Sequence, residues 1–410
     1  MDYKTNNYER TNRKKKNSNF LYFSLGILVF SRFSSHLIND IIGFPFYLIE
    51  IPLLIFCVIK YKSVILWLKK VVNKKLLILI FIALTYILVV LFSIKRNSSF
   101  FEVLSVSRGG LYIAIFAMLS SVRQKEYSYE FLFYLSLGAL FGDFISQVFI
   151  TDSEALKLNN LLTTTFAIML PIIHKKKIHV VIALSLALFV SFFSGYRISL
   201  LLFFISLMIV ITSFGIKKVK SMKVKAFDFV LFFLFTLVIA SYKRIADLFF
   251  YFMQNIVHMD PYSFYRVTKR FYQALTLNFD ASRDTMRFEA YSSLYTDFLE
   301  KLIPTGLAGR TIGIGIYYDL PMMYLYDAIG SLASFLLIVF ILFISVPRFV
   351  YVFTSIRPGT DAVIALSLPV LLILFILNAR FFLITYESIF MGLVLGRLIS
   401  KNFTYRIKLK

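Results

Sequence analysis

The chain has 410 residues, 59% of them hydrophobic, and its mean hydropathy of +0.77 lies far above the usual range of soluble globular proteins. Its net charge of +23 comes from basic residues clustered in short segments between apolar runs, which is typical of an inner-membrane protein and argues against nucleic-acid binding. One cysteine, Cys57, excludes an intrachain disulfide. The four scattered histidines form no zinc-ligand motif, so we expect no metal and no cofactor.

Apolar segments long enough to cross a bilayer as helices recur along the chain. They predict an all-α, polytopic membrane bundle of about twelve spans, at 20–36, 42–59, 76–94, 101–122, 131–150, 156–173, 178–194, 197–214, 227–243, 326–347, 361–378 and 381–399. Residues 1–243 would form an N-terminal bundle of about nine helices and residues 326–410 a C-terminal group of about three. The intervening segment 244–325 is the one long interruption.

The distribution of lysine and arginine predicts the orientation. Basic residues concentrate in the two terminal tails and in the segments 60–75, 123–130, 174–177, 215–226 and 348–360. The short loops of the opposite side hold only Arg32, Lys95, Arg96, Arg197 and Arg380. By the positive-inside rule, both termini are expected in the cytoplasm and the 244–325 loop in the periplasm.

Ionisable residues inside the predicted spans have an uneven depth. With this orientation the outer halves of the spans hold Glu50, Arg108, Asp143 and Glu387. The inner halves are nearly free of charge, apart from His179, Asp228 and Arg397 close to the cytoplasmic boundary. Intramembrane charges are costly and are functional candidates by default. We therefore expect a cavity open to the outer leaflet, although arginines at span ends also snorkel to water.

Two arginines of the bundle are candidates for binding an anion. Arg197 stands where one span ends and the next begins, so that a helix N-terminus and a guanidinium combine into a phosphate-binding arrangement. An ordinary turn with one exposed arginine is the alternative. Arg108 precedes Gly109 and Gly110, which permit close helix approach and would bury this arginine in the bundle.

The long loop contains two predicted helices, at roughly 262–276 and 284–302. In the second helix one apolar face recurs at helical spacing, formed by Tyr291, Leu294, Tyr295, Phe298 and Leu302. Arg287 and Arg283 precede Tyr291 by one and two turns on that face. If the face docks on the membrane domain, both arginines point inward; the alternative is that they face lipid headgroups.

A glycine-rich connector follows this helix and carries Arg310. It leads to Tyr318, Asp319 and Tyr324 ahead of the next span. The tyrosines fit either an interfacial belt or a platform on which sugars stack. Asp319 could act as a general base that takes a proton from a hydroxyl group. The other candidates for that role are Asp280, Asp284, Glu289 and His258.

These features together resemble the Wzy-type O-antigen and capsule polymerase family and, more distantly, the O-antigen ligases. The likeness rests on the span plan with one late periplasmic loop and on Ser194-Gly195-Tyr196-Arg197 ahead of a span. It also rests on Arg287 followed by Pro304-Thr305-Gly306-Leu307 and Tyr318-Asp319-Leu320, and ending at Tyr324–Gly330. As motif it covers some 60 residues.

The resemblance implies a GT-C-like, metal-independent glycosyltransferase of the bacterial inner membrane. Its partners would be oligosaccharides linked to undecaprenyl diphosphate, with membrane lipids and a chain-length regulator and flippase of the same pathway. Arg197 and Arg287 would hold the diphosphate and Asp319 would be the base. Supporting roles in binding diphosphate or glycan would fall to Arg283, Arg310, Arg108, Arg380, Tyr318 and Tyr324.

Three other functions compete with the polymerase. An O-antigen ligase would transfer the finished glycan to lipid A core, but ligases commonly carry a histidine where Asp319 stands, and this chain has none after His258. A flippase for the lipid-linked unit, or a solute transporter, should show charges through both leaflets. The depth of the charged residues favours an enzyme over either.

Overall fold

The computed structural model describes residues 17–31, 100–121, 123–149, 161–193, 197–220, 298–299, 302, 325–326, 329–354, 359–377, 385–400 and 402–403. Within these ranges the secondary structure is entirely helical, without a β-strand. The expected all-α class is therefore confirmed for this part of the chain. Three of the spans expected from the sequence (42–59, 76–94 and 227–243) lie outside it.

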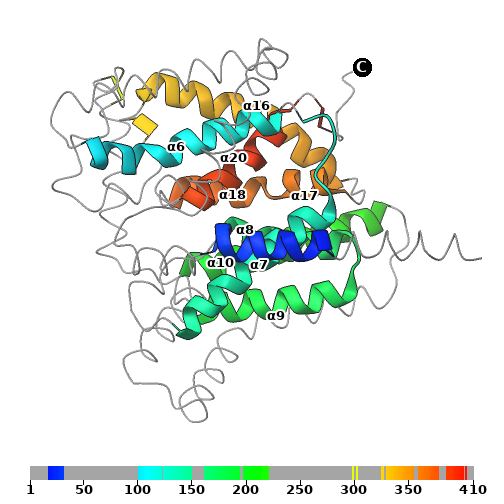
Figure 1. Cartoon of the computed structure of the whole chain (residues 1–410). Helices are drawn as coiled ribbons and strands as arrows, with labels where there is room; N and C mark the ends of the chain where they lie inside the picture. The colour runs from blue at the N-terminus through cyan, green and yellow to red at the C-terminus, as the bar shows by residue number, and fades with distance from the viewer. Residues whose placement is uncertain are drawn as a thin grey trace, which may run out of the picture.

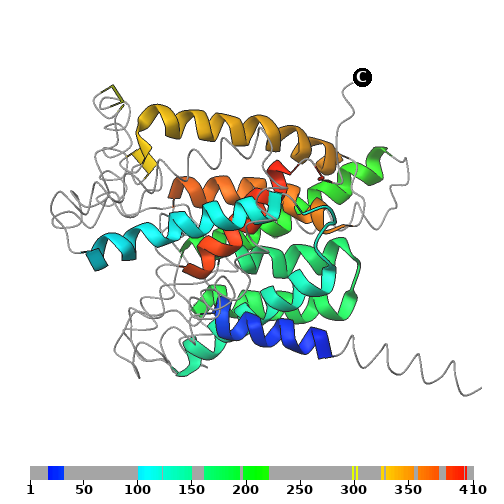
Figure 2. The same cartoon turned by 45° about the horizontal axis from the view of Figure 1, so that its top comes forward.

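The helices begin and end close to where the apolar runs do. They are the N-terminal helix Asn17–Phe30, α6 (Phe100–Ser121), α7 (Tyr129–Phe149), α8 (Leu161–Ile173), α9 (Lys177–Phe193), α10 (Arg197–Lys220), α16 (Ser331–Thr354), α17 (Thr360–Leu366), α18 (Leu368–Leu377) and α20 (Thr385–Ile399). Most run side by side along roughly one direction, as both ribbon views show (Figures 1 and 2). This arrangement gives the bundle two ends.

One end, which we call the Arg397 end, is where α6, α8 and α20 finish and α7, α9 and α17 begin. Contacts between residues far apart in the chain bring these termini together. The Ser120 hydroxyl donates to the carbonyl of Leu393 at 2.6 Å, and the Ser213 hydroxyl near the end of α10 donates to Phe353 of α16 at 2.8 Å. The Arg397 end thus joins elements from both halves of the sequence.

The segment expected as one span at 361–378 is two helices. Helix α17 ends at Leu366 and α18 begins at Leu368, with Ser367 between them. Proline at position 369 has no N–H to donate to the carbonyl four residues earlier, and its ring crowds that carbonyl. The break is the local consequence. Helix α16 also begins five residues later and ends seven residues later than the predicted 326–347.

Pairs of glycines four residues apart allow two close helix crossings. Gly138 of α7 lies against the backbone of Phe23 and Gly26 in the N-terminal helix, and Gly142 lies against Ser31. Gly392 and Gly396 of α20 lie against α6, where a Cβ added to Gly392 would stand 2.7 Å from the Ile113 carbonyl oxygen. Such spacing lets helix backbones approach one another, as in membrane helix pairs.

Helix α8 lies at the centre of the packed region. All but one of its residues are buried, and Phe166 packs edge-to-face on Phe390 of α20 at 5.1 Å between ring centroids. It contacts α7, α9, α10 and α20. Its mean composition is apolar, but Thr163, Thr164 and Thr165 form a buried hydroxyl-bearing turn. A hydrophobic helix buried on every side is the expected core element of a bundle.

The connection between α8 and α9 is a tight, hydrogen-bonded turn. The Lys176 N–H donates to the Pro171 carbonyl at 2.9 Å and the Lys175 N–H donates to the Ile172 carbonyl at 3.1 Å. Lys175 has a φ of 57°, the left-handed conformation that glycine usually supplies at the end of a helix. For a residue with a Cβ this conformation costs roughly 1–2 kcal/mol.

Several helices expose apolar faces. Helix α16 is long and apolar enough to cross a membrane, with a mean hydropathy of 2.5, and within the described residues it is the one helix that meets both conditions. Its exposed side chains recur at helical spacing, as Leu332, Phe335, Leu336, Val339, Phe343, Val346 and Val350. Phe343 is 79% exposed. Contiguous exposed apolar surface of this kind marks a protein or membrane contact.

The end of the long loop contacts the start of α16. The Phe298 ring lies edge-to-face against Tyr326 at 6.2 Å and against Phe335 at 6.5 Å between centroids. The Ser331 hydroxyl donates to the Phe298 carbonyl at 2.6 Å. Phe298 belongs to the apolar face predicted for the second loop helix. Leu302, from the same face, is 42% exposed, and the rest of that face lies outside the described residues.

The crossing of α20 with α6 yields a stability prediction. Gly396→Ala should lower the free energy of unfolding by about 2 kcal/mol, because the new methyl group would meet the backbone of Ala117. Gly215→Ala in α10 is the matched control, since nothing lies within 4 Å of its added Cβ. There alanine should stabilise the helix slightly. Unfolding of the purified variants measures both changes, and equal behaviour of the two would refute the close crossing.

Candidate functional site

The described residues include only part of the site expected from the sequence. Arg197 is the first residue of α10 and Arg108 lies within α6, both as expected, but the structure describes only their backbone. The other expected site residues lie outside the described ranges: Arg283, Arg287, Arg310, Tyr318, Asp319, Tyr324 and Arg380, with the alternative bases Asp280, Asp284, Glu289 and His258. Their roles remain predictions.

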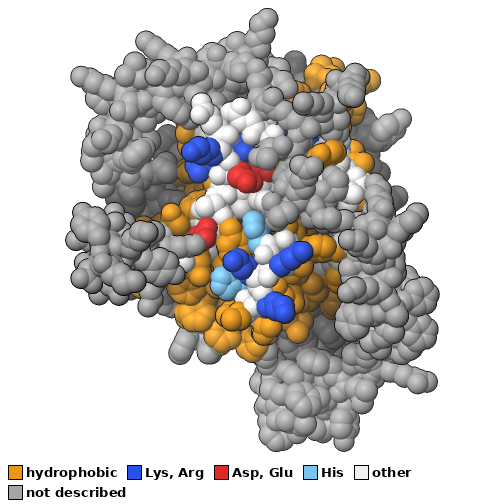
Figure 3. All heavy atoms as spheres, turned by 90° about the vertical axis from the view of Figure 1, so that its right-hand side faces the viewer, with side chains coloured by type: hydrophobic (Ala, Val, Ile, Leu, Met, Phe, Trp, Pro, Cys, Tyr) orange, Lys and Arg blue, Asp and Glu red, His pale blue; other side chains and the backbone are white. Residues whose placement is uncertain are grey.

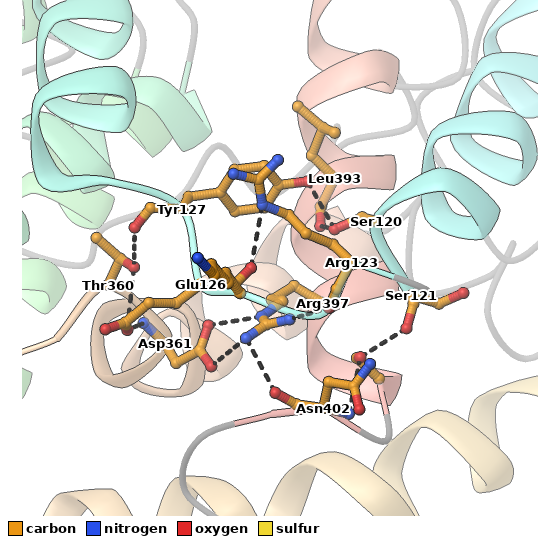
Figure 4. Close-up of polar contacts among 12 residues, drawn as sticks. Ser120, Ser121, Arg123, Glu126, Tyr127, Thr360, Asp361, Leu393, Arg397 and Asn402 are labelled. Atoms are coloured by element: carbon orange, nitrogen blue, oxygen red, sulfur yellow. Dashed lines mark hydrogen bonds and ion pairs between the residues drawn. The ribbon is translucent and has the colours of Figure 1, made fainter.

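A polar network occupies the Arg397 end, and its centre is a buried ion pair (Figure 4). The Arg397 Nε donates to Asp361 Oδ1 at 2.7 Å, and Nη2 donates to Oδ2 at 2.8 Å. Both side chains are fully buried. This bidentate geometry is the strongest form of an arginine–carboxylate contact, and it joins α20 to the first turn of α17.

The remaining donors of Arg397 reach backbone carbonyls. Its Nη1 donates to the Arg123 carbonyl at 2.6 Å and Nη2 donates to the Asn402 carbonyl at 3.0 Å. Four of the five N–H groups of the guanidinium are therefore taken up by protein acceptors. A buried charge is tolerated when it is paired and hydrogen-bonded in this way. The arrangement holds four chain segments together and leaves little capacity for a ligand.

Tyr127, in the connection between α6 and α7, extends the network. Its hydroxyl donates to Ser120 Oγ at 2.9 Å, and its carbonyl accepts from the Thr360 hydroxyl at 2.6 Å. Burial raises the pKa of the Tyr127 hydroxyl, so this group stays protonated and keeps its donor role. The Arg123 guanidinium lies over the Tyr127 ring at 4.5 Å, a cation–π contact at the surface.

Residues after α20 and at the end of α16 close the same end of the bundle. The Ser400 hydroxyl donates to the Ser121 carbonyl at 2.6 Å. Arg348 donates to the Ser400 carbonyl at 2.8 Å and lies over the Phe403 ring at 4.6 Å. Neighbouring polar groups are thus paired mostly with backbone carbonyls from distant segments. This pattern is that of a structural clamp, because acid–base or nucleophilic chemistry needs a group that can reach a substrate.

Sequence reasoning noted Arg397 near the cytoplasmic boundary but did not pair it with Asp361. A signal was present: an aspartate begins one predicted span and an arginine ends another, on the side to which both were assigned. Opposite charges at the same depth of a bundle are expected to pair. The glycine spacings at Gly138/Gly142 and Gly392/Gly396 were also readable signals for close helix approach.

Two buried carboxylates lie away from this network. Glu387, near the start of α20, is 5% exposed, and its Oε1 accepts the backbone N–H of Leu161 at 3.0 Å. This contact caps α8, whose N-terminal N–H groups have no partner within the helix, and a carboxylate is favoured there by the helix dipole. Asp143 of α7 is 2% exposed. Glu387, which its depth in the predicted span made a functional candidate, therefore has a structural role as the cap of α8.

Hydroxyl groups connect α8 and α10 within the same region. The Ser206 hydroxyl donates to its own helix at Leu202 and lies 3.3 Å from Thr165 Oγ1, which in turn donates to the Leu161 carbonyl. No group of three or more His, Cys, Asp or Glu residues in the described ranges could hold a metal ion. These contacts lie within one helix or between neighbouring helices. They are typical of serine and threonine side chains that are buried between packed helices.

The chain matches no protein-family model, no curated protein and no solved structure.

The buried ion pair gives a prediction for stability. Asp361→Ala should lower the free energy of unfolding by about 3–5 kcal/mol, because it leaves the buried Arg397 guanidinium without its counter-charge. In a separate comparison of the wild type, Asp361→Leu, Arg397→Met and the double variant, the double variant should cost about 2 kcal/mol less than the sum of the two single variants. Denaturant unfolding of the four proteins measures this coupling.

The control for this experiment is Glu126→Gln. Glu126 is an exposed carboxylate of the same network that accepts from Thr360 and from the Asp361 N–H at 3.3 and 3.4 Å. Glutamine keeps an acceptor oxygen, so the change should be within about 0.5 kcal/mol. Additive single substitutions at positions 361 and 397 would show that the pair does not stabilise the fold.

Proposed function

We propose that the chain is a membrane-embedded bundle of about twelve spans with both termini in the cytoplasm. The exposed apolar faces of α16 and α9 support this placement, because contiguous apolar surface of this kind is unfavourable in water and favourable in contact with lipid. The Arg397 end would then be the cytoplasmic end, because the exposed Lys175, Lys176 and Lys177 stand there. The long loop would lie on the periplasmic side.

We further propose that the chain is a polymerase of an O-antigen or a related surface polysaccharide. The observation that carries this proposal is the set of arginines that the expected topology assigns to the outer side, at Arg108, Arg197 and Arg380 in the bundle and at Arg283, Arg287 and Arg310 in the long loop. Guanidinium groups suit a diphosphate, which they can grip bidentately. The proposed donor is a glycan on undecaprenyl diphosphate, and the acceptor is one lipid-linked repeat unit.

The proposed reaction is a glycosyl transfer without a metal. A hydroxyl oxygen of the acceptor unit attacks the anomeric carbon of the donor glycan, while the bond from that carbon to the diphosphate oxygen breaks. Asp319 takes the hydroxyl proton. Undecaprenyl diphosphate leaves with the bonding electron pair, and Arg197 and Arg287 stabilise the charge that develops on it. Tyr318 and Tyr324 are proposed to contact the sugars.

The contacts of Arg397 argue against transport, one of the alternatives to the polymerase. A carrier for an anionic lipid-linked sugar needs cationic groups available on both halves of its path. The arginine that is buried at the Arg397 end has given its donors to Asp361 and to backbone carbonyls. The ligase alternative is less favoured because no histidine follows His258 in the chain.

The orientation can be tested by cysteine labelling. After Cys57→Ala removes the only cysteine, Leu299→Cys and Lys176→Cys provide two exposed positions, one in the long loop and one in the α8–α9 turn. A membrane-impermeant maleimide added to spheroplasts should label the loop position and leave the turn position unmodified until the membrane is opened. Labelling of both positions, or of the turn alone, would contradict the proposed topology.

The activity can be tested in the native host and with purified protein. Deletion should leave a single repeat unit on lipid A core in a surface-polysaccharide gel, whereas a ligase deletion would leave polymer unattached. Arg197→Ala and Arg287→Ala should lower chain extension by about a hundredfold or more, because each removes charge stabilisation at the leaving group. Arg123→Ala is the control, since this exposed arginine lies at the Arg397 end. Full extension by either site variant would remove that arginine from the proposed site.

A further inference from the structure

The turn between α8 and α9 presents three consecutive exposed lysines, Lys175, Lys176 and Lys177, at the Arg397 end. The space-filling view of this end shows lysine and arginine side chains gathered around histidine and bordered by hydrophobic surface (Figure 3). Three positive charges within one turn favour an anionic partner.

Aromatic rings of α7 pack against the histidines of this turn and of the start of α9. The Tyr129 hydroxyl lies 2.7 Å from His179 Nδ1, and the Tyr129 ring lies 4.7 Å from that of His174. Phe133 stacks on His179 at 4.6 Å between ring centroids. Together with the backbone hydrogen bonds that end α8, these contacts fix the position of the lysine backbone. A cationic turn whose backbone is already ordered loses less conformational entropy on binding than a flexible tail does.

Backbone geometry does not explain the residue at position 175. Lys175 adopts a left-handed φ of 57°, which glycine adopts without a penalty. A lysine at this position therefore lowers the stability of the fold relative to glycine. Residues held in a disfavoured backbone conformation are concentrated at functional sites.

The surface next to the lysines identifies the class of partner. In the first turns of α9 the side chains of Ile178, Val181 and Ile182 are exposed, Ile178 by 74%. Cationic groups at the end of a helix and apolar groups directly along it match a molecule with an anionic head and a hydrocarbon body. A phospholipid has that form, and basic groups near the cytoplasmic surface attract anionic lipids. A nucleic acid or an acidic peptide would leave the apolar groups uncovered.

The nearby acidic groups do not cancel the charge of the turn. Glu126 and Glu130 keep their negative charges, but the same segment also carries Arg123 and Lys125. These two cations match the two carboxylates in number, so the three charges of the turn remain uncompensated. Burial lowers the pKa of His174, which therefore stays neutral near pH 7 and adds no charge of its own. The positive charge is that of the lysines.

We propose that the α8–α9 turn is a binding site for the phosphate of anionic phospholipid headgroups in the inner leaflet. Lys175, Lys176 and Lys177 bind the phosphate, and Ile178, Val181 and Ile182 contact the acyl chains. The site anchors the Arg397 end of the bundle at the cytoplasmic surface. This inference rests on the membrane placement under Proposed function and does not depend on glycan polymerisation.

The test is a titration of the purified full chain with phosphatidylglycerol, phosphatidylcholine or inorganic phosphate, with bound lipid counted by native mass spectrometry. Replacing Lys175, Lys176 and Lys177 by Gln should weaken phosphatidylglycerol binding by roughly 10- to 100-fold, since each lysine near a membrane surface contributes about fivefold. Replacing Lys217, Lys218 and Lys220 by Gln is the matched control. It removes the same charge from the end of α10 at the same end of the bundle, and binding should weaken clearly less than in the α8–α9 variant, because no phosphate site is proposed there.

Lys175→Gly distinguishes a loss of binding that is caused by the missing charge from one that is caused by a destabilised fold. It should raise the thermal midpoint slightly, because glycine relieves the left-handed backbone, and should still weaken phosphatidylglycerol binding by about fivefold. Three results would overturn the proposal: equal loss of lipid in the α10 control, equal retention of phosphatidylcholine, or full displacement of the lipid by millimolar inorganic phosphate. A chain that binds phosphatidylglycerol in this way but does not extend glycans leaves this inference standing and refutes the polymerase alone.

Discussion

The buried pair of Arg397 and Asp361 is the interaction on which the Arg397 end depends. A guanidinium at zero exposure must be paired and hydrogen-bonded, or it costs several kcal/mol. Here its donors reach α17, the α6–α7 connection and the segment after α20 at once. The termini of helices from both halves of the sequence must therefore meet at one point, and the relative positions of these helices along the bundle follow from it.

The close crossing of α20 and α6 makes this pairing possible. Gly396 lies against Ala117, and Arg397 is the next residue along α20. Because the two backbones approach so closely at Gly396, the guanidinium reaches the Arg123 carbonyl just beyond the end of α6. A larger residue at position 396 would separate the helices and lengthen that contact. The glycine thus sets the distance between α20 and α6. The buried arginine sets how far along its axis α20 lies relative to its neighbours.

Helix positions could be predicted from sequence because long apolar runs determine where a helix can be buried, and α6, α7 and α9 begin and end within about two residues of the expected spans. The break before α18 was missed, although Pro369 carried the signal. The Asp361–Arg397 pair could not be derived, because which span lies beside which is a tertiary property. For the same reason Glu387 was seen as an intramembrane charge and not as the cap of α8. Of the candidate site itself, sequence supplied Arg197 at the start of a helix.

The contrast between Arg397 and the lysines of the α8–α9 turn shows how availability decides the role of a cation. Arg397 has four of its N–H groups committed to oxygen atoms of the protein, so it stabilises the fold and has little left for a ligand. Lys175, Lys176 and Lys177 are exposed, and the first of them occupies a backbone conformation that glycine would adopt more cheaply. Net charge alone would rank both as positive sites. The count of committed donors separates a structural cation from one that can bind an anion, and the same criterion applies to the arginines proposed for the diphosphate.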